Sequence, residues 1–104
     1  MKTVSIPSTG NEYMIGKILC IGRNYVDHVK ELGNEAPSAP VVFMKPATSV
    51  IGCGEQVVIP SYSSDCHYEA ELAVLIGADC KDVHGADALS CSAGYDVAID
   101  MTLR

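Results

Sequence analysis

The run His67–Ile76 constrains the fold more than any other part of the sequence, because it is rich in apolar residues and is ended by Gly77. In an extended strand, successive side chains point to opposite faces. One face therefore carries His67, Glu69 and Glu71. The side chains of the other face are Tyr68, Ala70, Leu72 and Val74. The run predicts the longest strand of the chain, with two carboxylates on one face.

Shorter segments with strand character lie before this run. They are Thr3–Pro7, Lys17–Ile21, Val41–Met44 and Val57–Pro60. Turn residues at 8–11 follow the first segment, Gly22 ends the second, and prolines bound the other two. We therefore expect a short strand at each of these segments, the first of them at a sheet edge.

The period of the apolar residues changes after Gly22. Tyr25, Val29 and Leu32 are spaced i, i+4 and i+7, which predicts a short helix that begins after Asn24. A second short helix is expected at 87–92, where the periodicity is weak, and the segment 95–101 alternates poorly. Because strands outnumber helices, the predicted fold class is β-rich α+β.

Composition limits the size and the partners of the chain. Its 104 residues suffice for one small domain, and 48% of them are hydrophobic, which is typical of a globular chain. Seven basic and thirteen acidic residues give a net charge of −6, which argues against binding to nucleic acid or to an anionic membrane through a basic face. No apolar stretch is long enough to span a membrane.

The cysteines and the first residues bear on the compartment. Five cysteines without a Cys-x-x-Cys pair predict reduced thiols rather than a disulfide framework or a zinc site. The first residues show neither the apolar run of a signal peptide nor an arginine-rich presequence. We expect a cytoplasmic protein.

The two glutamates of the long strand are candidate metal ligands. Glu69 and Glu71 are two residues apart, so they lie roughly 7 Å from each other along one face. A pair of carboxylates on an otherwise apolar strand suits a hard cation such as Mg²⁺ or Mn²⁺. The alternative is a solvated strand face with two ordinary surface glutamates, which the spacing does not exclude.

A second set of candidates combines a histidine and several cations. His28 and Glu31 are neighbours on the predicted helix, so the carboxylate can orient the imidazole as a general base for water. Arg23 lies at a strand-to-helix turn, and Lys45 and Arg104 are further cations that could bind a substrate carboxylate. The alternative for each is an exposed charge at the surface.

Four blocks of the sequence, in order, resemble the fumarylacetoacetate hydrolase family. The first is Cys20–Tyr25 with His28, Glu31, Leu32 and Gly33; the second is Phe43–Pro46 with Thr48 and Ser49. The third is His67–Gly77, and the fourth is Gly94 and Tyr95 followed by Asp100–Arg104. The branch that the blocks resemble most is that of acylpyruvate hydrolases and oxaloacetate decarboxylases.

The resemblance implies a role for each matching residue. Glu69, Glu71 and Asp100 correspond to the carboxylates that hold Mg²⁺ or Mn²⁺, although the residues alone leave Asp96 as a competitor for the third. His28 and Glu31 correspond to the dyad that activates water, and Arg104 to an arginine that binds substrate. Arg23 and Lys45 lie within matching blocks and are assigned to substrate binding.

The resemblance also implies a fold, an assembly and a reaction. The family fold is a mixed β-roll with short helices, usually paired as a homodimer, and residues 1–104 match only its N-terminal portion. The expected activity is metal-dependent hydrolysis or decarboxylation that cleaves a carbon–carbon bond in a small 2-oxo acid of the acylpyruvate, fumarylpyruvate or oxaloacetate type. Isomerase or hydratase activity, or a catalytically inactive fragment, is the alternative.

Overall fold

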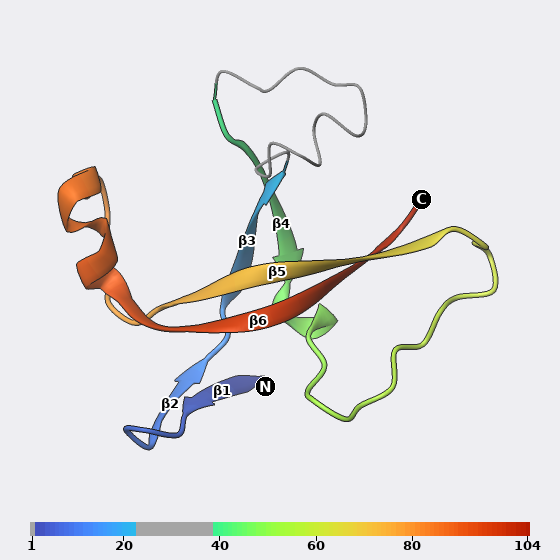
Figure 1. Cartoon of the computed structure of the whole chain (residues 1–104), viewed down its shortest axis with the longest axis horizontal. Helices are drawn as coiled ribbons and strands as arrows, with labels where there is room; N and C mark the ends of the chain where they lie inside the picture. Colours follow the sequence, from blue (N-terminus) through green and yellow to red (C-terminus); the bar gives the residue numbers. More distant parts are fainter. Residues whose placement is uncertain (1, 23–38) are drawn as a thin grey trace. The chain divides into compact units, whose positions relative to one another are not determined.

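The computed structural model describes residues 2–22 and 39–104, which belong to two compact units (Figure 1). The first unit is Met1–Gly54 and the second is Glu55–Arg104. In the described part of the chain the strands pair two by two, and every pair is antiparallel. The helix predicted after Asn24 lies outside the described residues. The β-rich character expected from the sequence is confirmed.

The first unit begins with a tight hairpin of β1 (Thr3–Ile6) and β2 (Asn11–Met14). The Gly10 N–H donates to the Ile6 carbonyl oxygen at 2.8 Å, and this bond closes the turn. Gly10 has φ of 76°, a left-handed conformation that costs glycine nothing because it has no Cβ. The strand at Thr3–Ile6 was predicted, whereas β2 was not.

The next sheet pairs β3 (Lys17–Gly22) with β4 (Val41–Pro46). Their register runs from Lys17 opposite Pro46 to Gly22 opposite Val41. Both predicted strands are confirmed, and each extends slightly further than expected. The 3₁₀-helix η1 (Ala47–Ser49) follows β4 directly, after Pro46.

The second unit is built on one long hairpin of β5 (Cys66–Ile76) and β6 (Ser92–Leu103), joined through the 3₁₀-helix η2 (Gly85–Cys91) (Figure 1). The register is regular from Cys66 to Leu75, with a shift between Leu75 and Ile76. With 12 residues against 11, β6 is longer than β5, so the expectation that His67–Ile76 forms the longest strand is wrong. The poorly alternating segment after Tyr95 is a strand because β5 supplies its hydrogen-bonding partners.

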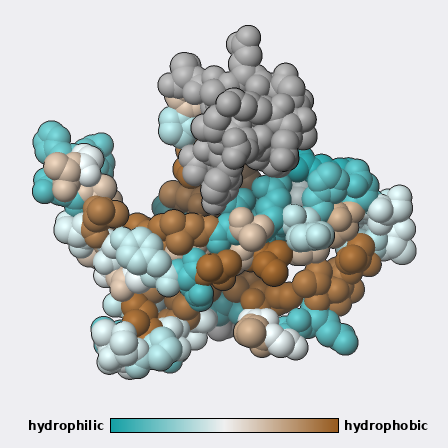
Figure 2. Space-filling view, in the orientation of Figure 1, coloured by the Kyte–Doolittle hydropathy of each residue, from teal (hydrophilic) through white to brown (hydrophobic). Residues whose placement is uncertain are grey.

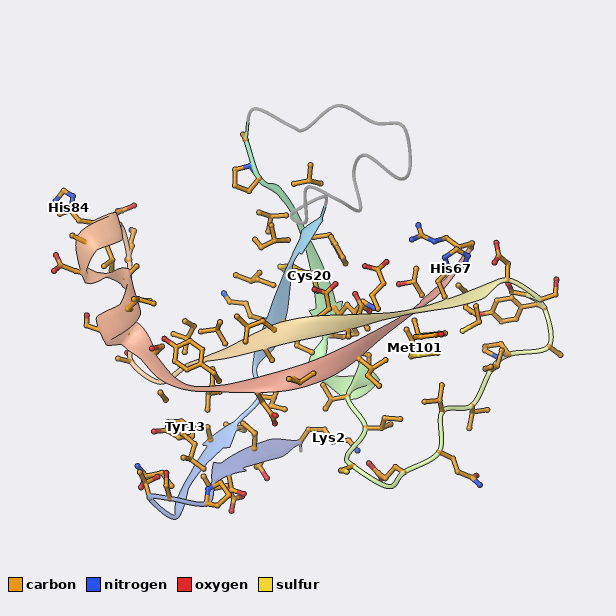
Figure 3. The ribbon with its side chains drawn as sticks, viewed as in Figure 1. Lys2, Tyr13, Cys20, His67, His84 and Met101 are labelled. Carbon is orange, nitrogen blue, oxygen red and sulfur yellow. The ribbon has the colours of Figure 1, made fainter. Side chains whose placement is uncertain are left out.

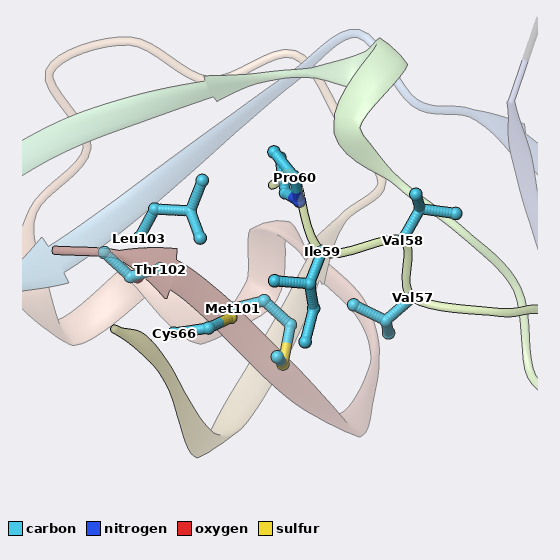
Figure 4. A pocket seen from close by; sticks show the side chains of 8 residues that line it. All are labelled: Val57, Val58, Ile59, Pro60, Cys66, Met101, Thr102 and Leu103. Carbon is cyan, nitrogen blue, oxygen red and sulfur yellow. The ribbon is translucent and has the colours of Figure 1, made fainter. Parts of the chain in front are cut away.

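The strand predicted at Val57–Pro60 is absent, since the structure assigns no regular element there. These residues line an open apolar pocket of 190 Å³ together with Cys66 and residues 101–103 of β6 (Figure 4). The apolar side chains of this run line the pocket but are not covered, since Val57, Val58 and Ile59 are 49%, 82% and 55% exposed.

The two faces of the β5–β6 hairpin differ in exposure. Tyr68, Leu72, Val97 and Ile99 lie on the apolar face and are each at least 65% exposed. Figure 2 shows many apolar side chains, coloured brown, at the molecular surface. No side chain in the described ranges is fully buried. An apolar sheet face of this kind is typical of a surface that another layer covers.

Among the described residues, no helix has the length and apolar character that crossing a bilayer requires.

The β1–β2 turn yields a test of the fold. We expect Gly10→Ala to lower the free energy of unfolding by about 1 kcal/mol, because alanine is strained at positive φ. Open space surrounds both Gly10 and Gly16, but Gly16 is not among the positive-φ glycines. Gly16→Ala is thus the matched control and should leave stability unchanged or slightly raised. Urea unfolding of both variants measures the difference, and equal effects would contradict the conformational explanation.

Candidate functional site

Three predicted carboxylates lie on one face of the β5–β6 hairpin. Glu69 of β5 is directly opposite Asp100 of β6, and Glu71 is opposite Ala98. Residues directly opposite each other share a face, with Cβ atoms about 5 Å apart, and diagonal neighbours are about 7–8 Å apart. Glu71 is a diagonal neighbour of Asp100. The backbone therefore brings these three residues, distant in the sequence, to one patch.

The register distinguishes Asp100 from its competitor Asp96. Asp96 is opposite Ala73, so it is a diagonal neighbour of Glu71 but is far from Glu69 along the strand. Its Oδ1 atom accepts a hydrogen bond from the Val97 N–H at 2.7 Å, and its side chain is exposed. Asp100 is half-buried. The hairpin thus favours Asp100 as the third carboxylate.

Arg104 adds a positive charge beside this patch. Its Nη2 atom lies 3.7 Å from Oε1 of Glu69. Its backbone is held in place because the Arg104 N–H donates to the Asp65 carbonyl oxygen at 2.8 Å and Ser63 Oγ donates to the Arg104 carbonyl oxygen at 3.3 Å. The side chains are 49% and 34% exposed, and such an ion pair contributes about 0.2–1 kcal/mol. The main effect of this ion pair is therefore to place the Arg104 guanidinium beside the carboxylates, and its contribution to stability is small.

The contact between His67 and Asp65, next to the carboxylate patch, was not predicted from the sequence. Nε2 of His67 lies 2.8 Å from Oδ1 of Asp65, and the two side chains are 50% and 62% exposed. Figure 3 labels His67. His67 shares the carboxylate face of β5 because it is two residues before Glu69. The Asp-x-His spacing is present in the sequence. Whether the two side chains come close, however, depends on the backbone conformation of residues 63–65, which precede β5. The pair can hold the imidazole in one orientation.

The carboxylate oxygens of the patch are the type of ligand that suits a hard cation. Three half-buried carboxylates supply the oxygen ligands that Mg²⁺ and Mn²⁺ prefer. In residues 2–22 and 39–104, however, no three His, Cys, Asp or Glu side chains lie close enough together to hold one ion. Glu69 instead faces the Arg104 guanidinium. The metal site stays a prediction.

The remaining predicted residues lie elsewhere. His28, Glu31 and Arg23 fall outside the described residues. Lys45 is half-buried on β4, opposite Ile18, in the first unit, whereas the carboxylates belong to the second. Their assigned roles stay predictions.

Comparison with known proteins places the chain in a family. The sequence model described as "Fumarylacetoacetate (FAA) hydrolase C-terminal" matches residues 17–104, which include β3 to β6 and the whole carboxylate patch. The chain belongs to the fumarylacetoacetate hydrolase family. The resemblance inferred from the four sequence blocks is therefore confirmed.

Individual members of the fumarylacetoacetate hydrolase family show the extent of the match. The mitochondrial oxaloacetate tautomerase of Bos taurus is 47% identical over 87 residues, which are 84% of this chain and 39% of that protein. The mitochondrial oxaloacetate decarboxylase of Dictyostelium discoideum is 47% identical over 90 residues, 85% of this chain and 41% of that protein. The chain spans about two fifths of the length of these relatives.

A crystal structure shows the same extent of similarity in three dimensions. It is that of an Oleispira antarctica protein named provisionally as a fumarylacetoacetate isomerase/hydrolase. The two structures superpose with a TM-score of 0.82 at 39% identity, over 91% of this chain and 43% of that chain. The similarity in three dimensions therefore extends over most of this chain but over less than half of the other chain.

The register of the hairpin predicts which aspartate contributes to cation binding. We expect Asp100→Asn to weaken Mn²⁺ binding by more than about tenfold, equivalent to about 1.4 kcal/mol, because it removes a charge directly opposite Glu69. Asp96→Asn is the matched control on the same strand and should leave the affinity unchanged. Calorimetric titration of Mn²⁺ measures both. A larger loss in the Asp96 variant would contradict the assignment.

Proposed function

We propose that this chain forms part of an enzyme that acts on a small 2-oxo acid of the acylpyruvate, fumarylpyruvate or oxaloacetate type. The observation that carries the proposal is the carboxylate patch of the hairpin, in which Glu69 and Asp100 are directly opposite each other and Arg104 lies beside them. Relatives named oxaloacetate tautomerase and oxaloacetate decarboxylase support the substrate class.

In this proposal, Glu69, Glu71 and Asp100 hold Mg²⁺ or Mn²⁺. A divalent cation held by these carboxylates would supply Lewis-acid stabilisation of the negative charge that develops on the substrate. Arg104 binds a substrate carboxylate, and its guanidinium offsets the negative charge that develops during the reaction. The anchored backbone of Arg104 supports this role because it limits where the guanidinium can lie.

His28 and Glu31 are proposed to move the proton. Glu31 orients the imidazole, and His28 takes a proton from water or from the carbon next to the 2-oxo group. Arg23 and Lys45 are proposed to bind the remaining anionic end of the substrate. All of these roles follow the family blocks in which the residues lie.

Hydrolysis, decarboxylation and tautomerisation share one requirement, which is the stabilisation of enolate charge at the 2-oxo acid. They differ in whether a carbon–carbon bond breaks and whether water attacks. The names of the relatives support oxaloacetate chemistry in particular, as a tautomerase or a decarboxylase. We propose carbon–carbon bond cleavage by hydrolysis or decarboxylation as the principal activity, and isomerisation as the alternative.

An inactive fragment is the second candidate. The chain spans 39% of the bovine relative's length, and the apolar face of β5–β6 is exposed. In this proposal a family β-roll would cover that face, and a homodimer in the cytoplasm would be its assembled form. A chain lacking such a cover is expected to self-associate and to bind metal weakly.

Turnover tests the proposed function. The protein that contains this chain, loaded with Mg²⁺ or Mn²⁺, is expected to convert at least one of oxaloacetate, acetylpyruvate and fumarylpyruvate. Glu71→Ala should lower kcat by about a hundredfold or more, because it removes a metal ligand. Pyruvate release and loss of the enol absorbance measure cleavage and tautomerisation separately.

The control is Cys66→Ser, which changes the residue opposite Leu103 on the same hairpin and should leave both activity and Mn²⁺ binding intact. If the metal-loaded protein converts none of the three substrates, the proposed function is wrong. If the 104-residue chain alone shows full activity, the inactive-fragment alternative is wrong.

A further inference from the structure

The residues just before β5 hold the backbone of Arg104 beside the carboxylate patch. The Arg104 N–H donates to the Asp65 carbonyl oxygen at 2.8 Å, and Ser63 Oγ donates to the Arg104 carbonyl oxygen at 3.3 Å. Ser63 Oγ also accepts a hydrogen bond from the Asp65 N–H at 3.2 Å. We call these three hydrogen bonds the Arg104 clamp. Both the N–H and the carbonyl group of Arg104 are bound within it.

The clamp lies at the open end of the β5–β6 hairpin. The ladder ends at the pair of Cys66 and Leu103, so Asp65 precedes β5 and Arg104 follows β6. Backbone pairing at the end of a hairpin opens more readily than pairing in its middle. The Ser63 hydroxyl therefore stabilises the place at which this hairpin would open first.

The guanidinium of Arg104 reaches the patch from a distance. Arg104 is four residues after Asp100, which is directly opposite Glu69, so the two rows are about 13 Å apart along the strands. Nη2 of Arg104 nevertheless lies 3.7 Å from Glu69 Oε1. The two side chains must therefore extend toward each other past the row of His67 and Thr102. A long side chain loses much rotamer freedom in such a position, so a fixed backbone is what makes the approach favourable.

We propose that Ser63 is a positioning residue for Arg104, because its hydroxyl fixes the backbone from which the guanidinium reaches the patch. This inference rests on the proposed function, in which Arg104 binds a substrate carboxylate. Ser63 acts through Arg104 and not on the substrate itself. Without the hydroxyl, the guanidinium would spend less time beside the carboxylates, and the substrate would bind more weakly.

Substitution of Ser63 tests the effect on substrate binding. In the protein that contains this chain, we expect Ser63→Ala to raise KM about fivefold for whichever of oxaloacetate, acetylpyruvate and fumarylpyruvate the unaltered protein converts fastest. The rise in KM should exceed the fall in kcat, because the ground state already makes the contact with the substrate carboxylate. Ser63→Thr keeps the hydroxyl and should restore KM. Ser64→Ala, which changes the exposed neighbouring serine, is the matched control and should have no effect.

A double-mutant cycle shows whether Ser63 acts through Arg104. Without the guanidinium the clamp has nothing to position, so Ser63→Ala should change kcat/KM by less than about 1.5-fold in an Arg104→Ala background. In the unaltered background the same substitution should lower kcat/KM about fivefold. Equal effects in the two backgrounds would show that Ser63 acts independently of Arg104 and would overturn the proposal.

Amide hydrogen exchange measures the clamp without any substrate. The Arg104 N–H donates to the Asp65 carbonyl oxygen, so it exchanges with deuterium only when the clamp opens. We expect Ser63→Ala to speed exchange at Arg104 at least about threefold and Ser63→Thr to leave it unchanged. Nuclear magnetic resonance follows this amide in each variant. An unchanged exchange rate in Ser63→Ala would overturn the proposal.

The outcomes distinguish this inference from the proposed function. If the unaltered protein converts a substrate and Ser63→Ala has the same KM, the positioning role is wrong and the proposed function stands. A loss of stability in Ser63→Ala with an unchanged KM would likewise leave the hydroxyl a structural role alone. If the unaltered protein converts none of the three substrates, the proposed function is wrong, and the positioning role is overturned with it.

Discussion

The antiparallel register of β5 against β6 is the constraint on which the candidate site depends. Glu69 lies opposite Asp100, and side chains alternate between the two faces along each strand. This one pairing therefore determines the face of all the remaining residues in the regular part of the hairpin. The carboxylates then share one side with His67, and Tyr68, Leu72, Val97 and Ile99 share the other. A slip of one residue would exchange the two sets. Chemistry and packing are thus specified by the same hydrogen bonds.

The two faces of that hairpin carry different side chains, with the carboxylates on one face and large apolar residues on the other. The carboxylate side is half-buried and carries the contact between Glu69 and the Arg104 guanidinium, while the apolar side is largely exposed. Concentrated negative charge needs a counter-ion, and exposed apolar area needs a covering surface. Arg104 meets part of the first requirement, because its backbone hydrogen bonds fix its position beside the patch.

Much of this arrangement could be predicted from the sequence, because it depends on alternation. The strand period assigns Glu69 and Glu71 to one face, and the family blocks favour Asp100 over Asp96 as the third carboxylate. The strand predicted at Val57–Pro60 was wrong because a short apolar run also suits the lining of a pocket, and local composition does not report whether a partner strand is present. The pairs Arg104–Glu69 and His67–Asp65 depend on how the chain enters and leaves the hairpin, which spacing alone does not specify.

The register shift between Leu75 and Ile76 bears on how the sequence can vary over evolution. An extra residue inside a ladder normally inverts every side chain beyond it. Here the irregularity lies next to the η2 connection, and the rows from Glu69 to Ala73 are on its far side. Insertions and deletions between Gly77 and Cys91 can therefore accumulate without altering the row that pairs Glu69 with Asp100. The hairpin separates a part free to change in length from a part whose length is fixed.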